Sequence, residues 1–203
     1  MVAVVYITGI TFIVILIALH FIKPEFDPSW RMISEYEIGK NGWLMRLAFF
    51  IWAACIASFT ITLIQASVKP HYVIDIWLFI ISIAMIGAGI FRTDPIDAST
   101  NSLNDVMHKV FGSIVILTFP IIGTIITVTY ISQEAVRMKA LLIIATALIW
   151  IGQVCFFGVT AISQRKNPNI KQGSPEVKIG WPNRIMVLSY VIWVFVATVC
   201  IIK

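Results

Sequence analysis

Residues Val2–Ile22 read VAVVYITGITFIVILIALHFI, a stretch without Asp, Glu, Lys or Arg. An apolar run of about 20 residues is long enough to cross the hydrocarbon core of a bilayer as an α-helix. A secretion signal would have basic residues before a shorter apolar run and small residues at a cleavage site after it. This stretch has neither, so we expect it to be a retained transmembrane helix.

Similar apolar runs follow along the whole chain. The 203 residues are 59% hydrophobic and 12% charged, whereas soluble domains carry about 25% charged residues. We therefore predict an all-α polytopic membrane protein, with a single six-helix transmembrane domain over residues 1–203. The predicted spans are Val2–Ile22, Gly42–Ala66, Tyr72–Phe91, Val106–Ile131, Ala135–Ser163 and Pro182–Ile202.

Pro120 lies in the middle of the predicted fourth span. Proline has no N–H, so the carbonyl of Ile116 loses its helical partner and a kink is expected. We expect the hydroxyls of Thr118 and Thr124 to help satisfy the freed backbone.

The basic residues predict an orientation. Eleven of the 15 Lys and Arg residues lie in or beside the loops that follow the first, third and fifth spans. Because cytoplasmic loops carry an excess of Lys and Arg, these three loops are predicted to be cytoplasmic. The net charge of +5 then reflects orientation and anionic headgroups, and we expect no nucleic-acid partner.

A polar interval, Phe91–Gly112, lies at the junction of the third and fourth predicted spans and reads FRTDPIDASTNSLNDVMHKVFG. Part of it is typical of helix ends: Ser102–Asp105 resembles a capping box, and Asp105 and Lys109 form an i,i+4 pair. Asp94, however, is held in a turn before Pro95, and His108 falls one turn into a predicted span. Ionisable groups at membrane depth are candidates for function, and His108, tuned by Asp94 or Asp105, would be a general base or proton relay.

Other polar residues fall at the same end of the predicted spans. We predict one pocket there, with His108, Asp94 and Glu35 as candidate catalytic residues. Arg184 would hold an anionic headgroup. The other candidate ligand-binding residues are Asn183, Ser34, Arg92 and His20.

The histidines are also candidate ligands for a metal or a haem. His20 and His108 with Asp94 or Glu35 would form a two-histidine, one-carboxylate set. No closely spaced histidine pair supports this set, and two lone histidines are weak evidence for haem. We therefore expect no metal and no other cofactor.

Several short motifs resemble an uncharacterised bacterial and archaeal membrane family, domain of unknown function 998. They are Ile33–Tyr36 with Gly39, Gly42–Met45, Phe91–Pro95, Asp105–Lys109 and Asn183–Arg184. The resemblance covers the whole chain and implies a six-helix bundle in a prokaryotic plasma membrane. It implies no activity.

Three functions remain open from the sequence. The first is binding of, or catalysis on, a lipid or amphiphile at one membrane interface. The second is a non-catalytic accessory or assembly subunit, with a protein partner or a second copy of the chain. The third is transport of a small neutral solute, because the predicted interior offers Thr118, Thr124, Thr127 and Gln153 but no mid-span charge.

Overall fold

The computed structural model describes residues 1–67, 69–95, 98, 100–131, 138–169 and 174–201. Within them lie six α-helices that are long and apolar enough to cross a membrane, as predicted. A short 3₁₀ helix, η1, lies between the first two. In chain order the elements are α1 (Val2–Ile22), η1 (Ile33–Glu37), α2 (Trp43–Ala66), α3 (Tyr72–Ile90), α4 (Leu103–Ile131), α5 (Lys139–Lys166) and α6 (Gly180–Ile201).

The helix ends differ from the predicted spans by a few residues. Helix α4 begins at Leu103 rather than Val106, because the Ser102 hydroxyl accepts the Asp105 backbone N–H at 3.2 Å. Helix α5 continues to Lys166, past the predicted end at Ser163. The predicted start of the fifth span at Ala135 and the predicted end of the sixth at Ile202 lie outside the described residues.

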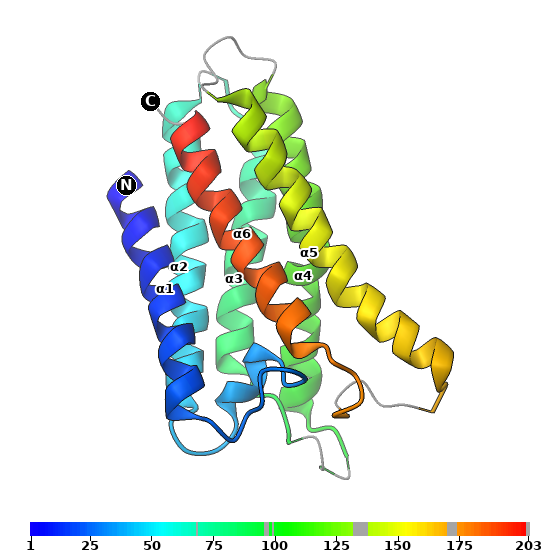
Figure 1. Cartoon of the computed structure of the whole chain (residues 1–203). Helices are drawn as coiled ribbons and strands as arrows, with labels where there is room; N and C mark the ends of the chain where they lie inside the picture. Colours follow the sequence, from blue (N-terminus) through cyan, green and yellow to red (C-terminus); the bar gives the residue numbers. More distant parts are fainter. Residues whose placement is uncertain (68, 96–97, 99, 132–137, 170–173, 202–203) are drawn as a thin grey trace.

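Consecutive helices lie side by side, and both termini lie at one end of the bundle (Figure 1). Helix α6 also contacts α1, α2 and α4, and aromatic pairs fill the space between helices. Their ring centroids lie 5.2 Å apart for Phe12–Trp52 and 4.3 Å apart for Phe119–Tyr190. A Cβ added to Gly152 of α5 would lie 2.9 Å from Cα of Met186, so glycine lets α5 and α6 approach closely.

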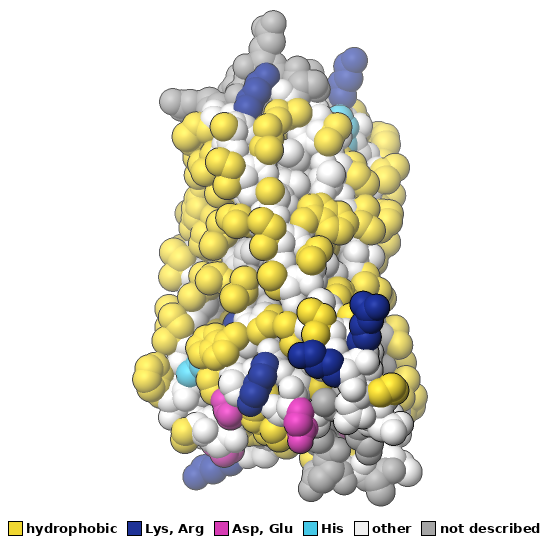
Figure 2. All heavy atoms as spheres, turned by 45° about the vertical axis from the view of Figure 1, so that its right-hand side comes forward, with side chains coloured by type: hydrophobic (Ala, Val, Ile, Leu, Met, Phe, Trp, Pro, Cys, Tyr) yellow, Lys and Arg dark blue, Asp and Glu magenta, His cyan; other side chains and the backbone are white. Residues whose placement is uncertain are grey.

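The outer surface has the distribution of side chains that a bilayer requires. Hydrophobic side chains cover the middle of the face seen in Figure 2, and the acidic and most of the basic side chains gather toward the ends. Apolar residues of α1 such as Ile7 and Val14 are more than half exposed, at 63% and 56%. Exposing aliphatic side chains along a whole helix costs free energy in water but not in lipid, so this surface is suited to a bilayer.

The backbone at Pro120 is satisfied by another helix. The carbonyl of Ile116 lies 3.1 Å from the Tyr190 hydroxyl of α6. The expectation for the two threonines was wrong, because Thr118 donates to Ile114 and Thr124 to Pro120 itself. A tyrosine from a neighbouring helix thus supplies the donor that proline lacks.

Helix α5 leaves the bundle at its C-terminal end. It lies along α6 near its start and then leans outward, so that its last turns stand apart from α4 and α6 in Figure 1. A cavity opens beside Phe156 and Phe157 of this helix.

Candidate functional site

The polar end of the bundle is built around η1. The chain leaves α1, turns back under the helices and buries Ile33, Glu35, Tyr36 and Glu37. Lys23, only 1% exposed, donates from Nζ to the carbonyl of Tyr36 at 2.9 Å and also to that of Ile38. Burial lowers the pKa of Lys23, and the two carbonyls satisfy its charge. This lysine therefore fixes η1 beneath the end of α1.

Arg184 of α6 joins the same loop to the bundle. Its Nε donates to Nε2 of His20 at 2.8 Å, one Nη donates to the carbonyl of Arg31 at 2.7 Å, and the other donates to the Tyr36 hydroxyl at 2.9 Å. His20 can accept because its Nδ1 lies 2.7 Å from the Leu16 carbonyl, which requires the proton there. All three nitrogens of the guanidinium thus donate to protein acceptors. This favours a structural role for Arg184 over headgroup binding.

Glu35 folds back on its own turn. One carboxylate oxygen accepts the Met32 backbone N–H at 2.7 Å, and the other lies 3.4 Å from the Arg31 guanidinium. Burial raises the pKa of Glu35, against the lowering effect of Arg31. These contacts belong to the 3₁₀ turn rather than to a ligand site.

Two aspartates hold the loop between α3 and α4. The Asp94 carboxylate accepts the backbone N–H of Ser102 at 2.6 Å and its hydroxyl at 2.9 Å. Asp105 accepts the Asp94 backbone N–H and the Thr93 hydroxyl, both at 3.1 Å, and pairs with Lys109 at 2.5 Å. Ser102 thus caps Asp105, but the reciprocal half of the predicted capping box is made by Asp94.

His108 lies against the end of α3. Its Nδ1 is 3.0 Å from the carbonyl of Ala88 and 2.9 Å from that of Phe91. The last carbonyls of a helix have no intrahelical donor, so His108 supplies one from the neighbouring helix. The predicted tuning by Asp94 or Asp105 was wrong: the carboxylate beside the ring is Glu37, with Oε2 at 3.6 Å from Nδ1.

Glu37 is a buried acidic group that lies beside His108. It is 5% exposed; Oε2 accepts the Thr93 N–H at 3.3 Å, and Oε1 has no partner among the described residues. Burial raises its pKa to about 8, against smaller lowering effects of the Thr93 N–H, Arg46 and Arg92. Glu37 is therefore mostly protonated at neutral pH, and this neutral form is the less costly one to bury.

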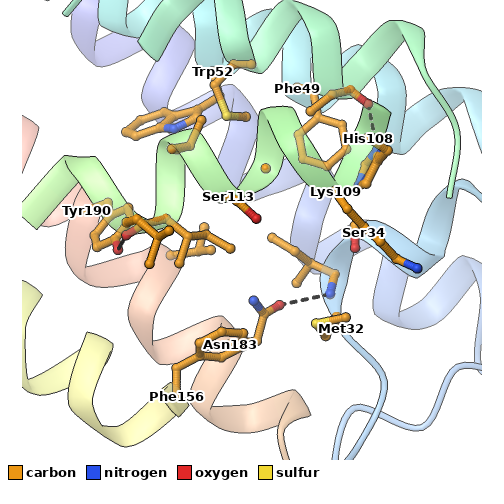
Figure 3. A pocket seen from close by; sticks show the side chains of 18 of the residues that line it. Met32, Ser34, Phe49, Trp52, His108, Lys109, Ser113, Phe156, Asn183 and Tyr190 are labelled. Carbon is orange, nitrogen blue, oxygen red and sulfur yellow. Dashed lines mark hydrogen bonds between the residues drawn. The ribbon is translucent and has the colours of Figure 1, made fainter. Parts of the chain in front are cut away.

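A cavity of about 390 Å³ extends from His108 into the bundle (Figure 3). Six aromatic side chains line it: Phe12, Phe49, Trp52, Phe156, Phe157 and Tyr190. The polar side chains on its lining are Ser34, His108, Lys109, Ser113 and Asn183, in addition to the Tyr190 hydroxyl. Leu117 of α4 and Phe157 of α5 also line it and are 53% and 41% exposed, so the cavity reaches the lipid-facing surface beside the outward-leaning part of α5.

The predicted site residues divide into three groups. His108, Ser34 and Asn183 line this cavity, whereas Arg184 and His20 line a smaller one of about 240 Å³ between α1 and α6. Glu35, Asp94 and Arg92 line neither. The structure thus does not bring Glu35, Asp94, His108 and Arg184 to a single pocket.

Some residues of this region were not predicted from the sequence. Glu37 follows the predicted Glu35 by two positions, and its charge next to a predicted span was the available indication. Ser113 and the aromatic residues carried no such indication, because serines and aromatics are common inside spans. Among the described residues, no group of three His, Cys, Asp or Glu side chains is placed to hold a metal ion.

Comparisons with known proteins identify a family but no characterised relative. No curated protein and no solved structure matched the chain. The model of one family, described as "Protein of unknown function (DUF998)", matches residues 6–200. This match covers nearly all of the chain and agrees with the motifs at η1, the α3–α4 loop and the start of α6; the protein belongs to the DUF998 family of membrane proteins.

Proposed function

We propose that this protein binds a membrane amphiphile in the cavity beside α5. The observation that carries the proposal is the arrangement of the lining, which is aromatic and aliphatic inside the bundle and polar at its charged end. Cavities of about 300–1,000 Å³ with an apolar lining and a few polar groups are typical of small-molecule sites. At about 390 Å³, this cavity would take one hydrocarbon chain or ring system.

The position of the cavity indicates where the ligand would come from. Leu117 and Phe157 line it and are also exposed on the outer surface, where lipid tails would lie. A ligand could enter laterally between α4 and α5, with its polar end at the level of the charged loops. Amphiphiles already hold this orientation in a membrane.

Two other functions have less support in the contacts. The interior polar groups that a transport path would use bind one another: Thr127 lies 2.7 Å from Thr146, and Gln153 lies 2.6 Å from Tyr190. An accessory subunit would need a partner surface, and no contact of the described residues favours one. Catalysis on the bound amphiphile is compatible with His108, but binding is the step that the geometry supports.

The test uses a hexadecyl alcohol with a photoreactive diazirine in the middle of its chain. After irradiation in vesicles, adducts located by mass spectrometry should concentrate on cavity-lining residues such as Trp52 and Phe156. Unlabelled hexadecanol should reduce these adducts. Adducts spread evenly over lipid-facing residues such as Val14, without competition, would contradict the proposal.

Two glycines provide a matched pair of variants. Beyond the backbone of its own helix, a Cβ added at Gly112 or at Gly158 has no atom within 4 Å. Both residues lie inside helices, so replacing either glycine should raise helix propensity by a similar amount. Gly112 lines the cavity and Gly158 does not. Gly112→Leu should therefore reduce the cavity adducts several-fold, whereas Gly158→Leu should leave them unchanged.

A further inference from the structure

The contacts of Nδ1 indicate which ring nitrogen of His108 carries the hydrogen. Nδ1 faces the carbonyls of Ala88 and Phe91 at 3.0 and 2.9 Å, and a carbonyl oxygen can only accept, so Nδ1 carries a hydrogen. In the neutral ring Nε2 is then a bare acceptor. Nε2 has no hydrogen-bond partner among the described residues, and the ring borders the cavity (Figure 3).

The charged groups near this end of the cavity already have partners within the protein. Lys109 is paired with Asp105 at 2.5 Å, and its ammonium group points away from the middle of the cavity in Figure 3. Arg184 and Lys23 are held by protein acceptors. Burial raises the pKa of Glu37 to about 8, so this group is mostly neutral at pH 7. Lys109 is the charged side chain on the described lining, and Asp105 neutralises it, so the lining presents no unpaired charge to select a charged headgroup.

The remaining polar groups of the lining include hydrogen-bond donors. The Asn183 side-chain oxygen accepts the Ile33 backbone N–H at 3.0 Å, which places the amide NH₂ on the other side, toward the cavity in Figure 3. The hydroxyls of Ser34 and Ser113 have no partner within the described part of the chain and lie on the same lining. The lining therefore offers an unpaired acceptor at His108 and donors elsewhere.

We propose that the polar end of the ligand is an uncharged hydroxyl group that donates to Nε2 of His108, while its oxygen accepts from the donors of the same lining. A hydroxyl is the smallest group that matches both functions. The ligand class is then a long-chain or ring-bearing alcohol, with the hydrocarbon part among the aromatic side chains. This inference rests on the proposed function, because it specifies the ligand of the same cavity.

The test compares three C16 competitors of the photoreactive alcohol at pH 7: hexadecanol, hexadecyl methyl ether and palmitate. The methyl ether keeps the chain and the oxygen but has no hydrogen to donate. Wild-type protein should prefer hexadecanol over the ether by about fivefold to tenfold, the usual effect of one hydrogen bond to a desolvated acceptor. Palmitate should compete less well than hexadecanol.

Two substitutions of His108 test the roles of its two ring nitrogens separately. Asn can place an amide N–H near the position of Nδ1 and has no group at Nε2, whereas Gln reaches the position of Nε2. His108→Asn should keep the contact with α3 and lose the preference for the alcohol over the ether. His108→Gln should retain the preference, because the amide oxygen can accept from the ligand hydroxyl.

The outcomes distinguish this inference from the proposed function. If no competitor reduces the cavity adducts, the proposed function, amphiphile binding in this cavity, is itself contradicted. If hexadecanol and the ether compete equally in the wild type, or if His108→Asn keeps the preference in folded protein, the cavity binds hydrocarbon and the hydroxyl assignment is overturned. Stronger competition by palmitate than by hexadecanol would also overturn it, in favour of an anionic ligand.

Discussion

At the scale of single residues, Arg184 shows how a charged group near a membrane can serve the fold. It is bonded to His20, to the Arg31 carbonyl and to the Tyr36 hydroxyl, and so connects α6, α1 and the η1 loop. Cations at span ends commonly bind headgroups. Here the guanidinium binds protein acceptors on several sides in place of headgroups. A lysine could not reach them together, because all its donors are on one nitrogen.

We expect Arg184→Met to lower the thermal unfolding midpoint of the purified protein in detergent by several degrees. The side-chain stem remains, but the acceptors of the guanidinium lose their donor, at about 1–3 kcal/mol each where water cannot replace it. Arg184→Lys should restore only part of the loss. Arg92→Met, at an exposed arginine, serves as the control. An unchanged midpoint in Arg184→Met, together with loss of amphiphile binding, would instead assign Arg184 to the ligand.

Glu37 leads to a prediction about pH. Its pKa of about 8 in the folded protein exceeds the ordinary value of 4.5, so between these values the folded protein holds a proton that the unfolded chain has released. The stabilisation from the protonated carboxyl group is fully present below about pH 4.5 and is lost as the pH rises to about 8. Each unit of difference between the folded and unfolded pKa corresponds to about 1.4 kcal/mol in the free energy of unfolding. Glu37→Gln should therefore raise the unfolding midpoint more at pH 9 than at pH 5.

The control for this measurement is Glu25→Gln, because Glu25 is exposed. Its unfolding midpoint should follow that of the wild type over the same pH range. In Glu37→Gln the introduced amide oxygen can still accept the Thr93 N–H, so the comparison isolates the ionisation of the carboxyl group. Equal gains from Glu37→Gln at pH 5 and pH 9 would show that this carboxyl group does not ionise in that window.

At the scale of elements, α4 and α6 are joined at the break that Pro120 makes in the α4 hydrogen bonds. The Tyr190 hydroxyl lies 3.1 Å from the Ile116 carbonyl and 2.6 Å from Gln153 Oε1. A hydroxyl has one hydrogen, so it serves one acceptor at a time unless the Gln153 amide turns its NH₂ toward it. Both Ile116 and Tyr190 also line the cavity, so this contact shapes its wall.

A double-mutant cycle tests whether the proline creates the need for the tyrosine. Tyr190→Phe should destabilise the wild type by about 1 kcal/mol, since the Ile116 carbonyl is left without a donor. In a Pro120→Ala background, the introduced alanine supplies its own N–H to the Ile116 carbonyl. Tyr190→Phe should then lower the free energy of unfolding by less than it does in the wild type. The measurement is the unfolding midpoint of the four proteins in one detergent. Equal costs in both backgrounds would show that Tyr190 acts through Gln153 alone.

The helices could be predicted from the sequence, whereas their side-chain partners could not. A run such as Val2–Ile22 has one stable structure in a bilayer, because only a helix satisfies its backbone there. The partner of His108, by contrast, depends on how η1 folds beneath α3 and α4, and so does the burial of Glu37. Local spacing pointed to Asp94 and Asp105, but both are used in holding the α3–α4 loop.

At the scale of the whole molecule, the two ends of the bundle differ in chemistry. The end with η1 carries the contacts of Lys23, Glu37 and Arg184 and the cavity, whereas both termini lie at the other end (Figure 1). The cavity therefore faces one leaflet, and the orientation of the protein decides which leaflet supplies a ligand.

We expect the η1 end to face the cytoplasm, because eleven of the 15 Lys and Arg residues lie in or beside its loops. Lys40 is exposed at the η1 end and Lys69 is exposed between α2 and α3, at the opposite end. In a Cys155→Ser background, which removes the exposed cysteine, a membrane-impermeant maleimide added to intact cells should label Lys69→Cys and not Lys40→Cys. After permeabilisation it should label both, which controls for reactivity. The reverse pattern in intact cells would place the cavity in the outer leaflet, where its ligand would be drawn from the lipids of that side.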